Sequence, residues 1–160
     1  MLALVLAAAT LMQVPFVPQK TDTCGAAALA MVTAYWGHPV GHDEIAGQLL
    51  DRELKAIRGS QLRDFAAARG LVAIAYEGDL AQLKDYLAKG RPLIVAWKVK
   101  RDRYHNVVVV GFDEERRVLL VNDPALGAAR EVAEAEFEKR WRGAGHWTLL
   151  VLPGEPAPPQ

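Results

Sequence analysis

The sequence predicts an α+β fold, in which a helical first half packs on an antiparallel sheet formed by the second half. Between residues 24 and 90, apolar residues recur at steps of three and four, the period of helices with one buried face. Beyond residue 91 they form short β-branched runs separated by turns. Helices followed by closely spaced strands are typical of this class, and 160 residues suffice for one domain with a substantial core.

Four helices are expected in the first half, each bounded by residues that begin or end helices. Gly37 is a C-terminal cap closely followed by a proline. Asp43 can cap the second helix, and Asp79 the fourth. With their caps, the helices cover residues 24–37, 44–54, 59–70 and 78–90, and a short strand is expected at 71–76.

The second half contains the strands. The runs 106–112 and 118–122 are joined by a charged turn at 113–117, and this short spacing predicts an antiparallel hairpin. The remaining expected elements are a strand at 92–99, a short helix at 134–141 and a last strand at 146–152.

The two ends differ from the rest and divide the chain into residues 1–13, 14–152 and 153–160. The first segment is uncharged and almost wholly apolar, too short to span a bilayer as a helix, and similar to the core of a signal peptide. It could also be a first buried element, or the true start could lie upstream. We expect an exported protein, periplasmic or extracellular, which this segment could bring to a membrane; the alternative is a cytoplasmic one. The last segment is a Pro-rich tail.

Charge and composition exclude several classes of function. The chain has 19 Lys and Arg against 19 Asp and Glu, so its formal net charge is zero and no nucleic-acid surface is indicated. The sequence has no glycine-rich phosphate loop and no paired-cysteine metal pattern, so we expect neither a cofactor nor a metal ion. Its single cysteine excludes an internal disulfide.

Cys24 has the position of a reactive thiol. It is expected in the first turn of its helix, where free backbone N–H groups and the positive end of the helix dipole favour a thiolate. A lone cysteine can equally be a small buried apolar side chain, so its position alone leaves both interpretations open.

A thiol nucleophile needs a base, and the base needs a group that holds its tautomer. His105 is predicted to begin one strand of the hairpin and Asp123 to end the other. Folding the chain about a turn near Glu114 brings the two opposite each other, about 5 Å apart. An ordinary structural contact at the strand ends would give the same pairing.

The other histidines are interpreted as structural. His38 and His42 follow the first helix and are expected in a surface loop, roughly 15–20 Å from Cys24 for a helix of about a dozen residues. His146 begins the last strand and has no acidic partner within sequence reach.

Gln19 precedes the cysteine by five residues, in an extended stretch. Its side-chain amide could join the free N–H groups of the helix start in an oxyanion hole. A solvated loop residue is the simpler interpretation of Gln19 on its own.

Four blocks of sequence together resemble the peptidase C39-like family: PFVPQKTDTCGAAALAMVTAYWG, YHNVVVVGFD, VLLVNDPALG and EFEKRW. This family comprises papain-like cysteine peptidases related to the domain that removes leader peptides in bacteriocin exporters. The resemblance covers about residues 14–152 and implies a papain-like fold. Matched by motif, it implies a nucleophile, a base, an orienting acid and an oxyanion-hole amide at Cys24, His105, Asp123 and Gln19, respectively.

The resemblance implies hydrolysis of a peptide bond through a thioester on Cys24, without a metal ion or a cofactor. Two alternatives stay open: an acyltransferase or amidase of the same fold, and a non-catalytic domain that holds a peptide in the same cleft. We expect a monomer that binds a peptide or protein substrate.

Overall fold

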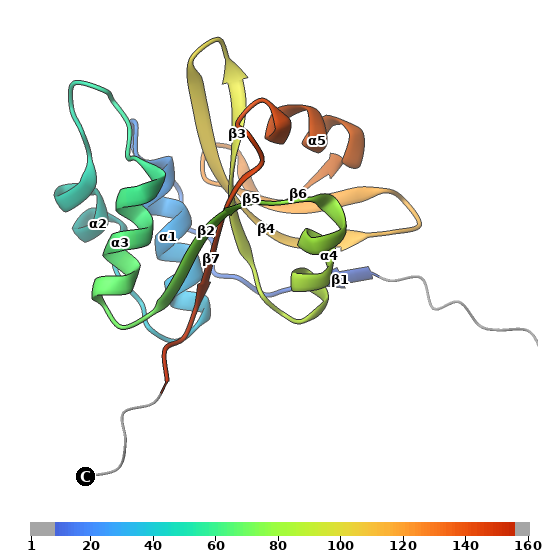
Figure 1. Cartoon of the computed structure of the whole chain (residues 1–160), viewed down its shortest axis with the longest axis horizontal. Coiled ribbons are helices and arrows are strands. Elements are labelled where there is room, and N and C mark those ends of the chain that lie inside the picture. Colours follow the sequence, from blue (N-terminus) through green and yellow to red (C-terminus); the bar gives the residue numbers. More distant parts are fainter. Residues whose placement is uncertain (1–8, 156–160) are drawn as a thin grey trace, which may run out of the picture.

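An antiparallel sheet lies at the centre of the computed structural model, which describes residues 9–155 (Figure 1). Six strands of this part of the chain follow the order β2-β7-β3-β4-β5-β6, and β1 pairs with the end of β4 that β3 leaves free. The strands are β1 (Ala9–Leu11), β2 (Val72–Glu77), β3 (Leu93–Lys100), β4 (Arg103–Asp113), β5 (Val118–Asp123), β6 (Gly127–Ala133) and β7 (Trp147–Leu152).

Helices cover both faces of this sheet. In Figure 1, α1, α2 and α3 lie on one side of it and α4 and α5 on the other. Helix α1 contacts β4 and β3 from the first side, and α5 packs on β3 from the second. The predicted α+β class, with a helical layer on an antiparallel sheet, is therefore confirmed. The helices are α1 (Cys24–Tyr35), α2 (His42–Leu49), α3 (Gly59–Ala68), α4 (Leu80–Ala88) and α5 (Glu134–Arg142).

Helix α1 runs through the interior rather than along one side of it. All residues from Gly25 to Thr33 are buried, although the sequence predicts a single apolar stripe. Its five alanines let α2, α3 and β4 approach from several directions. Because the helix is packed on so many sides, its first residue, Cys24, is held on a rigid element.

Helix α2 differs from its prediction at both ends. It covers His42–Leu49, whereas the sequence predicts residues 44–54 with Asp43 as the cap. Asp43 instead lies in the first turn, where a carboxylate is also favourable because of the helix dipole. The chain turns soon after the helix because the carboxylate of Asp51 accepts hydrogen bonds from the backbone N–H groups of residues 53 and 54, both at 3.0 Å.

The sequence does not predict strand β6. Most of its residues are exposed, and its only apolar side chain larger than alanine is Val132. β6 lies at the edge of the sheet and pairs with β5 alone. An edge strand that buries neither face has no alternating apolar pattern, so it leaves no periodic signal in the sequence.

Strand β1 lies within the segment 1–13 that the sequence analysis separates from the domain. Ala9–Leu11 pairs with the end of β4, and Met12, which is 9% exposed, joins the core. The sheet therefore begins before the predicted domain boundary. The two strands approach closely because Gly111 has no side chain, and a Cβ there would collide with the backbone carbonyl of Thr10.

The predicted export signal and Pro-rich tail fall mainly on residues 1–8 and 156–160, which lie outside the described residues. Within residues 9–155, no helix is long and apolar enough to cross a membrane. Localisation and membrane contact stay predictions.

Candidate active site

Cys24 is the first residue of α1, and its surroundings leave the start of this helix free to interact with a negative charge. The preceding residue, Thr23, directs its hydroxyl to Lys20 rather than to the helix, and no acidic residue lies in the first turn. The first-turn N–H groups and the dipole therefore act on the partly buried thiol.

His105 and Asp123 are in direct contact. The Nε2 atom of His105 lies 2.7 Å from Oδ1 of Asp123, whose side chain is only 5% exposed. The same carboxylate oxygen accepts the backbone N–H of Ala125 at 2.9 Å, which holds it in place. Because Nε2 is engaged with the carboxylate, Nδ1 is the ring nitrogen left for Cys24.

The register of the hairpin differs from the one predicted. β4 begins at Arg103, so His105 is its third residue and not its first. Asp113 pairs with Val118, so the turn is centred later than the predicted Glu114, and an irregularity in β4 then changes the register by one residue. The pairing of Val108 with Asn122, continued by one residue, sets Asp123 opposite position 107. The histidine and the carboxylate thus meet diagonally rather than as direct cross-strand partners.

Asn106, which is not among the residues predicted for the site, also contacts the thiol. Its side-chain amide donates a hydrogen bond to Sγ of Cys24 at 3.8 Å, and its backbone forms a further hydrogen bond with the thiol. Its only sequence signal is its position next to His105. Gly25 leaves room for this contact, because a Cβ there would lie 3.2 Å from the Asn106 amide nitrogen, a tight approach.

These contacts shift the pKa values of all three ionisable groups. Burial by itself would raise the pKa of Cys24, but hydrogen bonds with His105 and Asn106 and the charge of His105 outweigh it, and the pKa lies below 9.0. Burial would lower the pKa of His105, yet hydrogen bonds and charges from Asp123 and Cys24 raise it to about 9. The pKa of Asp123, which burial would raise, is held below 3.8 chiefly by His105. The site therefore favours a thiolate–imidazolium pair.

Gln19 lies beside these residues. Its backbone N–H donates to the carbonyl of Pro124 at 3.0 Å, which ties the extended stretch to the residue after Asp123. Its Oε1 is buried and has no hydrogen-bond partner among residues 9–155. The side-chain NH₂ group of Gln19 forms no hydrogen bond within residues 9–155 either, so its N–H groups are available to a ligand.

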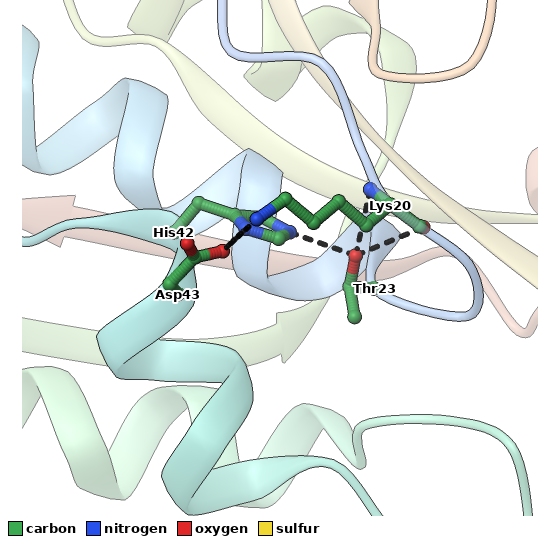
Figure 2. A network of polar contacts seen from close by, with 4 residues as sticks. All are labelled: Lys20, Thr23, His42 and Asp43. Carbon is green, nitrogen blue, oxygen red and sulfur yellow. Dashed lines mark hydrogen bonds and ion pairs between the residues drawn. The ribbon is translucent and has the colours of Figure 1, made fainter.

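A polar network supports the turn that precedes α1 (Figure 2). The hydroxyl of Thr23 accepts from the backbone N–H of Lys20 at 3.0 Å and donates to its carbonyl at 2.9 Å. Nε2 of His42 lies 2.7 Å from the same hydroxyl, and its Nδ1 lies 2.9 Å from Asp43. The ammonium group of Lys20 completes the network with a 2.6 Å contact to Asp43.

The prediction that His42 is a surface loop residue far from Cys24 is therefore wrong. Its side chain is 9% exposed and contacts Thr23, the direct neighbour of Cys24. The chain between Gly37 and His42 has no regular secondary structure. Fully extended, these residues can cover about 15–18 Å at 3.3 Å per residue, enough to return along α1.

The remaining two histidines have no part in the site. His38 is exposed. Nε2 of His146 lies 2.6 Å from Glu138, and its ring packs edge-on against Trp141. The prediction that His146 has no acidic partner is therefore wrong, because Glu138 on α5 contacts it.

Two cavities meet at this site. One, of about 790 Å³, is lined by parts of the β3–β4 hairpin, the β5–β6 turn and α5. The other, of about 570 Å³, includes Cys24 and Asn106 and reaches the loop before α3. Gln19, Tyr104 and His105 line both. An extended ligand that lies across both cavities would pass the thiol near its middle.

Three solved structures share this fold. A double glycine motif protease from an AMS/PCAT transporter, solved in complex with the leader peptide, is 26% identical with a TM-score of 0.73, over 89% of this chain and 94% of that one. A protein described as a C39-like peptidase from Bacillus anthracis is 16% identical with a TM-score of 0.75, over 93% and 100%. The peptidase domain of Streptococcus ComA, a bifunctional ABC transporter, is 22% identical with a TM-score of 0.72, over 86% and 97%.

The last two similarities concern the fold alone. No curated protein sequence matches the chain significantly. The model of the Peptidase_C39 like family, however, matches residues 11–148, nearly the whole of the described structure. The chain belongs to the Peptidase_C39 like family.

Proposed function

We propose that the chain is a cysteine peptidase that hydrolyses a peptide bond through a thioester on Cys24. The observation that carries this proposal is the contact of Cys24 with His105, whose other ring nitrogen is held by Asp123 at 2.7 Å. A cysteine that only fills space needs neither a lowered pKa nor an oriented base.

In the proposed acylation step, the Cys24 thiolate attacks the carbonyl carbon of the substrate, and the carbonyl π electrons move to oxygen. The oxyanion accepts hydrogen bonds from the side-chain amide of Gln19 and the backbone N–H of Cys24. When the intermediate collapses, the C–N bond breaks and the leaving amine takes the proton of His105 Nδ1. The enzyme then holds a thioester and a neutral imidazole.

Deacylation reverses these roles. Neutral His105 removes a proton from water as the water oxygen attacks the thioester carbon, and the C–S bond breaks to release the carboxylic acid. The products are the thiolate and the imidazolium with which the cycle began. Asp123 stays ionised throughout, because its role is to hold Nε2–H and stabilise the charged ring.

A peptide ligand is supported by the similar transporter protease, which was solved with a leader peptide. The same fold could deliver the acyl group to an amine instead of water, or could hold a peptide without cleaving it. These three functions differ in their products.

The test is incubation of the purified chain with a mixture of peptides, followed by mass spectrometry of the products. We expect new peptide termini, and Cys24→Ala and His105→Ala should each reduce their formation on the order of 10³-fold or more. Mass additions that appear only with an added amine acceptor would identify an acyltransferase. Peptide binding without cleavage, unchanged in Cys24→Ala, would identify a binding domain.

A further inference from the structure

The two halves of the cleft differ in net charge, although the formal net charge of the whole chain is zero. The 790 Å³ cavity lies between the tip of the β3–β4 hairpin and α5, which are neighbours in Figure 1. Apart from His105, its charged lining consists of two carboxylates and six cations: Asp123, Glu136, Lys98, Lys100, Arg101, Arg103, Lys139 and Arg140. The 570 Å³ cavity is balanced, with two of each: Asp22, Asp102, Lys55 and Arg103.

The carboxylates of the larger cavity do not neutralise this excess. Asp123 is engaged with His105 at 2.7 Å, and Glu136 with Arg140 at 2.8 Å. None of the other five cations forms an ion pair within residues 9–155. Asp102 is the one acidic residue of the hairpin tip, and it faces the balanced cavity. Uncompensated positive charge is therefore concentrated on one side of Cys24.

The same cavity also presents apolar side chains to solvent. Val99 and Tyr104, at the hairpin tip, are each 56% exposed, and Leu126, in the β5–β6 turn, is 65% exposed. Exposed apolar groups rimmed by charge are typical of a surface that binds a partner chain. A small free anion would gain nothing from contact with these apolar side chains, whereas a peptide can contact both the cations and the apolar groups.

We infer that this half of the cleft selects substrates with Asp or Glu side chains among apolar ones, on the side of the scissile bond that occupies the 790 Å³ cavity. The inference rests on the proposed function, because it assumes that a peptide crosses the cleft. Cations on both the hairpin and α5 attract such a segment and set its position. The balanced cavity on the other side exerts no such selection.

The experiment compares cleavage of three peptide sets that carry acidic, neutral or basic residues on either side of the cleaved bond. We expect kcat/KM to be highest for acidic residues on one side only, and this preference to shrink with salt because the pairs are exposed. The double variant Lys100→Glu/Lys139→Glu changes one cation on each wall. It should lower kcat/KM for the acidic set about tenfold, the combined effect of reversing two exposed charges, and should favour the basic set.

The matched control is Arg52→Glu/Arg130→Glu, which has the same change of net charge at exposed residues that line neither cavity. It should keep the acidic preference. Equal cleavage of all three sets by the wild type, or a preference that survives in Lys100→Glu/Lys139→Glu, would overturn the inference.

A failure of the proposed function is distinguishable from a failure of this inference. If no peptide is cleaved, the same three sets, labelled with a fluorophore, are titrated with Cys24→Ala and followed by anisotropy. Tighter binding of the acidic set, lost in the Lys100→Glu/Lys139→Glu background, supports the charged cleft even without catalysis. Equal binding of the three sets contradicts it.

Discussion

Replacing Asn106 by alanine tests whether the site stabilises a thiolate. The substitution removes the side-chain N–H that lies 3.8 Å from Sγ of Cys24. It leaves the backbone hydrogen bond from position 106 and the contacts of His105 in place. The variant therefore isolates one donor from the others that lower the pKa of the thiol.

The expected size of the effect follows from the geometry. A hydrogen bond to a charged group is worth about 1.5–3 kcal/mol, and a contact as long as this belongs at the lower end. Since one pKa unit corresponds to about 1.4 kcal/mol, the pKa of Cys24 should rise by about one unit. The sign is fixed because the lost donor interacts with the thiolate and hardly with the neutral thiol.

The assay is the rate of reaction with an aromatic disulfide reagent as a function of pH. Cys24 is the only cysteine, so the absorbance change reports this thiol alone. At a pH below the Cys24 pKa of both the wild type and Asn106→Ala, the thiolate fraction of the variant should be about tenfold lower. The reaction rate should fall only about threefold, because a more basic thiolate is intrinsically more nucleophilic. The midpoint of the profile is therefore the decisive quantity.

Two further variants serve as controls for this measurement. His105→Ala removes a hydrogen bond and a positive charge, so the midpoint should move further than in Asn106→Ala, toward or above 9.0 because burial then dominates. Cys24→Ser should not react at all. An unchanged midpoint in Asn106→Ala, with an unchanged near-ultraviolet circular dichroism spectrum, would refute the assignment of Asn106 as a thiolate donor.

Three other outcomes are expected. In an assay of peptide cleavage, kcat/KM should fall as the pH rises through about 9, because His105 must carry the proton that the leaving amine takes; a rate that still rises at about pH 10 would contradict the role of its imidazolium. Gly111→Ala should detach β1, since the methyl group meets the backbone of that strand, and hydrogen exchange should then increase at residues 9–11 but not at β6. His42→Ala should lower the free energy of unfolding by about 0.5–1.5 kcal/mol in a urea titration, because it removes one hydrogen bond from the Thr23 hydroxyl, which keeps its two hydrogen bonds with Lys20. Replacing the exposed His38 by alanine should change it by less than about 0.5 kcal/mol.

Local signals in the sequence were sufficient for many of the elements. Helix α1 begins at Cys24 as predicted, and Asp79 caps α4 by accepting the N–H of Gln82 at 2.9 Å. The hairpin of β4 and β5 forms about the predicted charged turn. Each of these features depends on residues close together in the chain, so a cap, a glycine or an apolar period is enough to indicate it.

Features that depend on partners distant in sequence were missed or misplaced. β6 has no apolar pattern because it lies at an edge, and β1 is recognisable only from its pairing with β4. The hairpin turns between residues 115 and 116 rather than near Glu114, and the irregularity in β4 changes the register by one residue in the opposite sense, so position 107 and not 105 lies opposite Asp123. Asn106 contacts Cys24, which lies 82 residues away in the sequence, and His42 contacts Thr23, which lies 19 residues away.

The sequence alone determined that Cys24 would begin a helix and that His105 and Asp123 would lie near each other, because helix starts and hairpins are local. Only the tertiary structure decided how the thiol is held, since this depends on which face of β4 meets the start of α1 and on the connection from α1 to α2, which brings His42 back to Thr23. The charge of the cleft has the same origin. Cations from the hairpin and from α5 are far apart in the sequence, and they form one surface only because β3 and α5 pack together.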